Sequence, residues 1–467
     1  MSRIYSFLFK NSYFICVVAF VFLFHSFSIL RKFAWGDDWA FISAYKQGDL
    51  GVTTEHYSGY RPLLQKIMDF SFGNIHNYED LVFLRLIATL GLVIVVWLLM
   101  EKLGKLGFSK NFTCAVGLGV SLLPTFWIYT NWASTFIYSW VCALSILSLN
   151  LFDKYKMISF SVIVACFLIY QPAAVFSVTL IFAGYIQKGK FSRANIQYLS
   201  MVLIGAIFAI ATGKMVNQLL DVPAKTRTGF ISTPGEFIDK VLWLVSRPLV
   251  LSFRPFLLES HGLVPLGITV VGFALSAVAF IHILKKGSLL RNIYSFIGLY
   301  CFGMLSLLPI SENQIEFRIL PTTSAMGLIL VGIGVRTIFE QKSSPFFLRS
   351  CIGILAFIVV AVYSETKIQQ IFIKSFEINQ KLILNSMNTQ TPEKVIVISD
   401  YSVVWPQRNY VGALSVISDF QMPWVPVGEV SQVLRIDESK ISLVDSKLKD
   451  VQPNVLVINL NSFRDKL

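Results

Sequence analysis

Long apolar runs separated by short polar connectors dominate the chain. A run of roughly 20 apolar residues is long enough to cross a bilayer as a helix. The pattern therefore predicts a polytopic α-helical membrane protein with about eleven spans. We place these spans at residues 12–30, 81–100, 111–128, 132–152, 157–170, 172–187, 195–212, 262–284, 292–310, 319–339 and 348–364.

The apolar stretch 157–187 is long for one helix and short for two. Basic clusters flank both of its ends, so the chain should return to the side that it left. We interpret Tyr170-Gln171-Pro172 as a tight turn between two short helices, because proline fits the first position of a helix. A re-entrant hairpin is the alternative geometry, and it would leave the topology unchanged.

Two longer connectors, residues 31–80 and 213–261, contain amphipathic stretches. Helices of this kind lie in the membrane interface with their apolar side toward the acyl chains. A further span in the second connector is disfavoured by Arg247 and Arg254, each of which is followed by a proline.

The pattern changes after residue 364. Residues 366–386 predict a polar amphipathic helix, and Val395–Ile398 and Val455–Ile458 predict short buried strands. We therefore expect a transmembrane domain at 1–364 and a small soluble α/β domain at 365–467.

Composition strengthens the membrane interpretation and excludes other classes. Of the 467 residues 55% are hydrophobic and 14% are charged, and the mean hydropathy is +0.64; soluble domains carry about a quarter charged residues. The net charge of +13 is spread through short connectors, so a nucleic-acid partner is not expected. The six cysteines lie in apolar segments without a Cys-x-x-Cys pair, and are interpreted as small buried hydrophobes.

Lysine and arginine concentrate at one set of helix ends, which identifies that side as cytoplasmic. The first apolar run is long and Arg31-Lys32-Phe33 is unlike a cleavage site, so we expect an uncleaved signal anchor with a cytoplasmic N-terminus. The opposite side then receives the C-terminal domain and the connectors with unusual polar residues. These connectors are 31–80, 129–132, 170–172, 213–261 and 311–318.

The stretch Trp35-Gly36-Asp37-Asp38-Trp39 follows the first apolar run and places two carboxylates at a headgroup surface. One interpretation is helix capping, because aspartate favours a helix N-terminus. The other is catalytic: one carboxylate acts as a general base on an acceptor hydroxyl, while the other tunes it or holds a cation.

Further polar residues on the same predicted side are candidates for substrate binding. From the residues alone, Arg61 and Arg318 are more often headgroup anchors or snorkelling side chains; because a guanidinium offers a planar fork to phosphate oxygens, they are the preferred partners if the substrate carries a phosphate. Arg85 lies within the second span, near enough to its start to reach the interface. The other candidates, each with solvated loop charge or a turn residue as its alternative, are His56, Tyr57, Gln171, Arg254, Glu312 and Glu316.

An apolar first helix, an Asp-Asp pair in an external loop and a Gly59-Tyr60-Arg61-Pro62 element resemble the GT-C superfamily of membrane glycosyltransferases. More narrowly, Tyr170-Gln171-Pro172 and Arg318 before Ile319-Leu320-Pro321 are similar to the bacterial glucosyltransferase group related to serotype-converting O-antigen enzymes. The resemblance covers roughly residues 10–340, and Asp-Asp is its most specific motif. The second element reads Gly-Tyr-Arg rather than Gly-Arg, which weakens the assignment of Arg61.

The resemblance implies a polyprenyl-phosphate-sugar donor, a glycan or lipid-linked acceptor and a bacterial inner membrane with a periplasmic C-terminal domain. It also implies that Asp37 or Asp38 is the catalytic base or binds a metal. No motif indicates a cofactor; a divalent cation, if used, is expected at Asp37 or Asp38. A sugar that leaves a lipid phosphate leaves negative charge there, which the arginines would stabilise.

Two alternatives stay open. An O-antigen polymerase is also polytopic with basic external loops, but would depend mainly on arginines rather than on an early Asp-Asp pair. A lipid-linked sugar transporter or flippase usually has polar residues at the membrane midplane and paired repeats, and neither is evident in the sequence.

Overall fold

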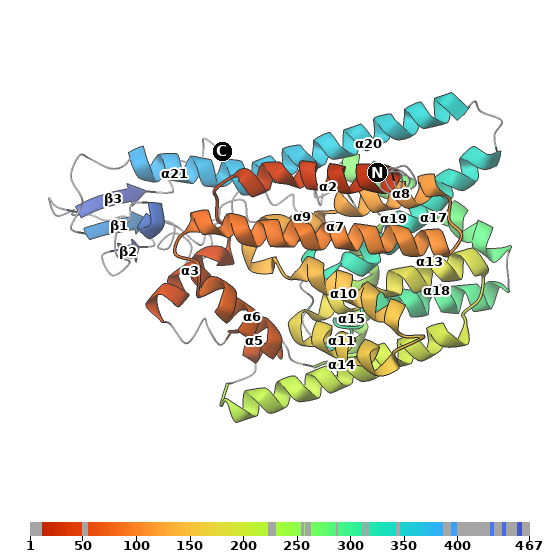
Figure 1. Ribbon diagram of the computed structural model, residues 1–467, viewed down its shortest axis with the longest axis horizontal. Helices are drawn as coiled ribbons and strands as arrows, with labels where there is room; N and C mark the ends of the chain where they lie inside the picture. Colours follow the sequence, from red (N-terminus) through yellow and green to blue (C-terminus); the bar gives the residue numbers. More distant parts are fainter. Residues whose placement is uncertain are drawn as a thin grey trace, which may run out of the picture.

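The computed structural model describes a predominantly helical molecule with a small sheet (Figure 1). The described residues are 12–48, 55–222, 230–253, 256, 263–285, 288–310, 313, 317–341, 346–385, 394–398, 430–433, 441–444 and 455–459. Its α-helices are α2 (Ser12–Leu30), α3 (Asp37–Gln47), α5 (Glu55–Ser58), α6 (Pro62–Phe72), α7 (Leu81–Lys105), α8 (Lys110–Ser121), α9 (Pro124–Asn131), α10 (Tyr138–Leu151), α11 (Lys156–Ile169), α12 (Gln171–Ala174), α13 (Val178–Lys188), α14 (Arg193–Leu219), α15 (Pro234–Leu244), α16 (Val250–Ser252), α17 (Leu263–Leu284), α18 (Leu289–Gly303), α19 (Pro321–Gln341), α20 (Phe346–Ile368) and α21 (Ser375–Asn385).

Shorter helical elements join some of these helices. The 3₁₀ turns are η1 (Tyr78–Asp80), η2 (Ala133–Thr135) and η5 (Phe317–Ile319), and the π-helical segments are η4 (Val245–Leu249) and η6 (Gln369–Lys374). Pro248 lies inside η4 rather than ending the helix there. The wider π turn accommodates a residue that cannot donate a backbone hydrogen bond.

The prediction of an α-helical membrane protein is confirmed at the level of helix length and composition. Among the described residues, five helices are long and apolar enough to cross a membrane: Tyr78–Lys105, Ala133–Leu151, Arg193–Leu219, Leu266–Leu284 and Pro321–Phe339. Helices α8 and α9, bent by 53° at their junction, would make a sixth span if counted together. Every predicted span overlaps a helix, but the number of about eleven crossings stays a prediction.

The turn predicted at Tyr170-Gln171-Pro172 is present. Helix α11 ends at Ile169, and α12 begins at Gln171 with Pro172 in its first turn. The missing N–H of proline costs no hydrogen bond there, because the first N–H groups of a helix have no partner within the helix.

Several helices end at other residues than the spans predicted for them, and α14 and α18 differ most. Helix α14 runs to Leu219 instead of residue 212, because no proline interrupts residues 213–219. Helix α18 ends at Gly303 instead of residue 310, and turns follow it. Pro309 lacks an N–H for a helix, and its carbonyl accepts the N–H of Ile231 over 2.9 Å instead.

The C-terminal part contains one continuous helical run and a parallel sheet. Helix α20 passes through η6 into α21 and so crosses the predicted boundary at residue 364. Strands β1 (Lys394–Ile398), β2 (Ile441–Val444) and β3 (Val455–Asn459) pair in the order β2-β1-β3. β1 and β3 coincide with the two predicted strands, whereas the domain division and the α/β domain stay predictions.

Candidate functional site

The entry into α3 is a sharp turn at Gly36. This residue has φ 56° and ψ −122°, and a Cβ placed on it would lie 3.3 Å from Cζ2 of Trp132. Only glycine adopts this conformation without strain and leaves room for the indole. The turn puts Asp37 and Asp38 in the first turn of α3, between the buried side chains of Trp35 and Trp39.

Asp38 is completely buried and holds two segments of the chain together. Its Oδ2 accepts the backbone N–H groups of Trp35 at 3.2 Å and Ala133 at 3.3 Å, and its Oδ1 accepts that of Ser134 at 2.7 Å. The residue that precedes α3 is Gly36, and the helix end has no side-chain cap. The capping interpretation is therefore wrong for Asp38, whose carboxylate instead binds the start of η2.

Arg85 accompanies Asp38 in the protein interior. It is 0% exposed and is therefore held inside the protein, whereas its depth relative to the membrane interface stays a prediction. Its guanidinium donates to the carbonyls of Phe33 at 2.7 Å and Arg31 at 3.1 Å, and it lies 3.9 Å from the centre of the Phe33 ring. These carbonyls follow the end of α2, where the backbone has left the helix and needs donors.

Charge and burial act in opposite directions on Asp38. Burial raises the pKa of its carboxyl from 3.8 to about 7, while the positive charge of Arg85 and the three N–H donors oppose that rise. Asp37, its neighbour, is partly exposed. The pair thus divides into one residue that is completely buried and one that is partly exposed.

Trp132 connects the aspartates to Arg318. The Trp132 ring packs edge-to-face against Trp35 with 4.6 Å between ring centres. The guanidinium carbon of Arg318 lies 4.9 Å from the centre of the Trp132 ring. The two residues that follow Trp132 donate to Asp38. Sequence reasoning missed Trp132, although it adjoins the predicted external turn at 129–132, which was the available signal.

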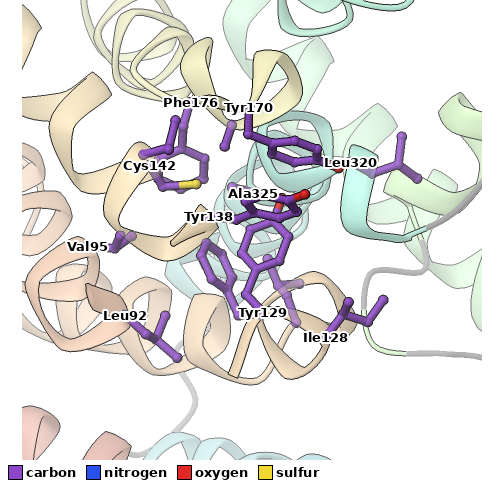
Figure 2. Close-up of a cluster of buried hydrophobic side chains, with 14 of the residues drawn as sticks. Leu92, Val95, Ile128, Tyr129, Tyr138, Cys142, Tyr170, Phe176, Leu320 and Ala325 are labelled. Atoms are coloured by element: carbon purple, nitrogen blue, oxygen red, sulfur yellow. The ribbon is translucent and has the colours of Figure 1, made fainter. Parts of the chain in front are cut away.

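A tyrosine cluster fixes the backbone at Arg318. The hydroxyl groups of Tyr129 and Tyr170 donate to the Arg318 carbonyl over 2.5 and 3.2 Å. Figure 2 shows Tyr129, Tyr138 and Tyr170 gathered beside Leu320. The rings of Tyr138 and Tyr170 are stacked with 3.6 Å between their centres.

Arg61 reaches the same cluster from another connector. Its Nε donates to Oε1 of Gln171 over 2.8 Å, and its guanidinium carbon lies 5.3 Å from the centre of the Tyr170 ring. Tyr60 before it has φ 59°, and its backbone is pressed against Gly213, where a Cβ would lie 3.0 Å from Tyr60 Cα. Arg61, Gln171 and Arg318 thus meet around Tyr170.

His56 and Tyr57 lie in α5 and take part in packing the same connector. The His56 carbonyl accepts the backbone N–H of Arg61 over 2.9 Å, and its ring stacks on Phe41 with 5.5 Å between centres. Tyr57 is buried, with the Lys66 ammonium 5.8 Å from its ring centre. Both residues support the turn that holds Arg61.

Three of the predicted binding residues, Arg254, Glu312 and Glu316, lie outside the described residues. In the part of the chain that the structure describes, no three His, Cys, Asp or Glu side chains are placed to share a metal ion. Both oxygens of Asp38 already accept backbone N–H groups, so this carboxylate does not fit a role as cation ligand.

Comparisons with known proteins identify no relative: no protein-family model matches the chain, and neither does any curated protein.

Proposed function

We propose that the chain is a GT-C-type membrane glycosyltransferase. It would move a hexose, with glucose expected, from a polyprenyl-phosphate donor to a periplasmic acceptor such as the O-antigen of lipopolysaccharide or another lipid-linked glycan. The observation that carries the proposal is the convergence of an Asp-Asp turn and two arginines on Trp132 and Tyr170. These residues come from connectors that are far apart in the sequence.

The two arginines would bind the phosphate of the donor. When the bond between the anomeric carbon and the phosphate oxygen breaks, the electron pair stays on the phosphate, and two guanidinium groups stabilise that charge. The aromatic contact of each arginine and the Arg61–Gln171 hydrogen bond hold the guanidinium groups in place before the reaction. Guanidinium groups that are already in position need no reorganisation when negative charge develops on the leaving phosphate.

Asp37 is the proposed base. It would take the proton of the acceptor hydroxyl as the acceptor oxygen bonds to the anomeric carbon. Its partial exposure supports this choice over Asp38, which is fully buried with both oxygens bound to backbone N–H groups. Asp38 would act as a positioning residue through the backbone of α3.

The proposed topology has about eleven spans, a cytoplasmic N-terminus and a periplasmic C-terminal domain in a bacterial inner membrane. Support comes from contacts between connectors that the charge pattern assigns to one side. Asp38 joins loop 31–80 to η2, Arg61 joins that loop to the 170–172 turn, and Arg318 contacts Trp132.

The test measures transfer of labelled hexose from polyprenyl-phosphate-hexose in membranes that hold matched amounts of wild type, Asp37→Asn, Asp38→Asn or Asp239→Asn protein. Asp239 is an exposed carboxylate on α15 and serves as the control. We expect Asp37→Asn to lose transfer by about 10²-fold or more, as for a general base. Asp239→Asn should keep the wild-type rate.

Wild-type protein that inserts normally but transfers no sugar from any lipid-phosphate donor would overturn the proposal. Accumulated single repeat units in a deletion strain would then favour an O-antigen polymerase. Full transfer by Asp37→Asn would overturn the assignment of the base.

A further inference from the structure

We infer that η6 and α21 form a clamp on the Asp37–Asp38 turn, so that the C-terminal helical run positions the candidate base. The clamp consists of Phe372 and Phe376, and Glu377 and Gln380 make polar contacts beside it. Its importance for transfer rests on the proposed function, whereas its effect on the conformation of the turn does not.

The clamp contacts both tryptophans that flank the aspartates. Phe372 packs edge-to-face against Trp35 with 5.1 Å between ring centres, and Phe376 stacks on Trp39 at 6.0 Å. Phe376 also lies 5.3 Å from the ring centre of Tyr78 in η1. All four rings of the Phe–Trp pairs are at most 3% exposed. One face of the C-terminal helix therefore covers the turn at its beginning and at its end.

Polar contacts extend the clamp on both sides of the aromatic pairs. The guanidinium of Arg31 donates to Oε1 of Glu377 over 2.6 Å, and Nε2 of Gln380 donates to the Tyr78 hydroxyl over 2.8 Å. The side chains of Arg31 and Glu377 are 53% and 42% exposed. Exposed ion pairs of this kind contribute little to stability, so the buried aromatic contacts should dominate.

The course of α20 brings the clamp to this place. Figure 1 shows α20 running along α2 and continuing into α21 beyond the end of α2, and Phe20 of α2 contacts Phe357 of α20 with 5.0 Å between ring centres. The π segment η6 begins where the run leaves α20, and it contributes Phe372. Such wide turns are rare and recur at functional sites.

The turn is consequently held from two directions. Asp38 and Arg85 fix its backbone from η2 and α7, and the clamp covers its tryptophans. Loss of the clamp would leave the Asp38 contacts in place but free the tryptophans to move. The position of Asp37 relative to a bound acceptor would then fluctuate, which lowers kcat more than it weakens donor binding.

The experiment compares wild type with Phe372→Ala/Phe376→Ala and with the milder Phe372→Leu/Phe376→Leu. Two controls lie on the same helix: Leu384→Ala, at a side chain that is 51% exposed, and Glu377→Gln, in the exposed ion pair. Amide hydrogen exchange of residues 31–47 reports the turn without any assay of activity. Steady-state transfer supplies kcat and KM for the donor.

We expect the double alanine variant to exchange these amides about tenfold faster and to lose about tenfold in kcat, with KM changed less than about twofold, because two aromatic contacts are removed. The leucine variant should show the same changes in smaller size, and the two controls should match wild type. If the alanine variant does not insert into the membrane, amide exchange and kcat of the leucine variant test the clamp instead.

If the inserted double alanine variant exchanges the amides of residues 31–47 at the wild-type rate, the clamp is overturned, whatever the transfer activity of that variant. Faster exchange together with unchanged kcat would overturn its positioning role. Faster exchange in a protein whose wild type transfers no sugar would leave the clamp in place and refute the proposed function instead.

Discussion

The backbone N–H of Ser134 donates a 2.7 Å hydrogen bond to Oδ1 of Asp38, across 96 positions of sequence. This contact attaches the Asp37–Asp38 turn to η2, and so to Trp132 and Arg318. It explains why two adjacent aspartates in one motif have different surroundings. Asp37 is partly exposed, and Asp38 is completely buried.

Replacement of Asp38 should destabilise the protein more when the new side chain offers fewer hydrogen-bond acceptors to the backbone N–H groups of Trp35, Ala133 and Ser134. Asp38→Ala leaves three N–H groups and the buried Arg85 charge without a carboxylate, and we expect a loss of about 3–5 kcal/mol in the free energy of unfolding. Asp38→Asn keeps an amide oxygen as acceptor and should cost less. Thermal unfolding in detergent measures both, and an unchanged melting temperature for Asp38→Ala would contradict the assignment.

The stability should also depend on pH through Asp38. Because burial raises its pKa from 3.8 to about 7, the folded state holds the proton more tightly than the unfolded state does. The contribution of this group to the free energy of unfolding is fully present below its ordinary pKa of 3.8, and it is lost as the pH rises through about 7. The melting temperature of wild type relative to Asp38→Asn should therefore fall between about pH 5 and about pH 8. A difference that is constant over this range would contradict the raised pKa.

Gly36→Ala should disturb the site through a clash as well as through backbone strain. Its φ of 56° is unfavourable for alanine, and the new Cβ would lie 3.3 Å from Trp132. Gly48→Ala is the matched control, since Gly48 has φ 70° but no atom within 4 Å of its Cβ position. Strain alone costs about 1–2 kcal/mol. We expect both variants to lose stability by about that amount, but only Gly36→Ala to lose transfer activity in the assay described above.

Trp132 should affect transfer through Arg318. Trp132→Leu removes the ring beneath the guanidinium, and a partly desolvated cation–π contact contributes about 1–2 kcal/mol, so we expect a decrease in kcat/KM of about tenfold. Trp132→Phe keeps an aromatic face and should retain most of the activity. Equal losses in the two variants would indicate that packing against Trp35, rather than the contact with Arg318, determines the effect.

Several features could be predicted because their causes are local. Apolar length marks the helices, and Pro172 marks the start of α12 after a turn. That loop 31–80, the 170–172 turn and the segment before α19 share one side stays a prediction, which the contacts of Arg61 and of the Arg318 carbonyl with Tyr170 support. The continuous apolar run Val395–Ile398 similarly located β1.

What the sequence by itself determined is therefore the class of protein, the approximate positions of its helices and the connectors that carry polar chemistry, because hydrophobic length and proline act within a few residues. The tertiary structure alone decided which aspartate is buried, that Arg85 stays inside, that Trp132 joins the two halves of the site and that Phe372 and Phe376 cover the tryptophans. These outcomes depend on hydrogen-bond donors and rings brought from distant segments, and no local pattern around Asp37 or Asp38 encodes such partners.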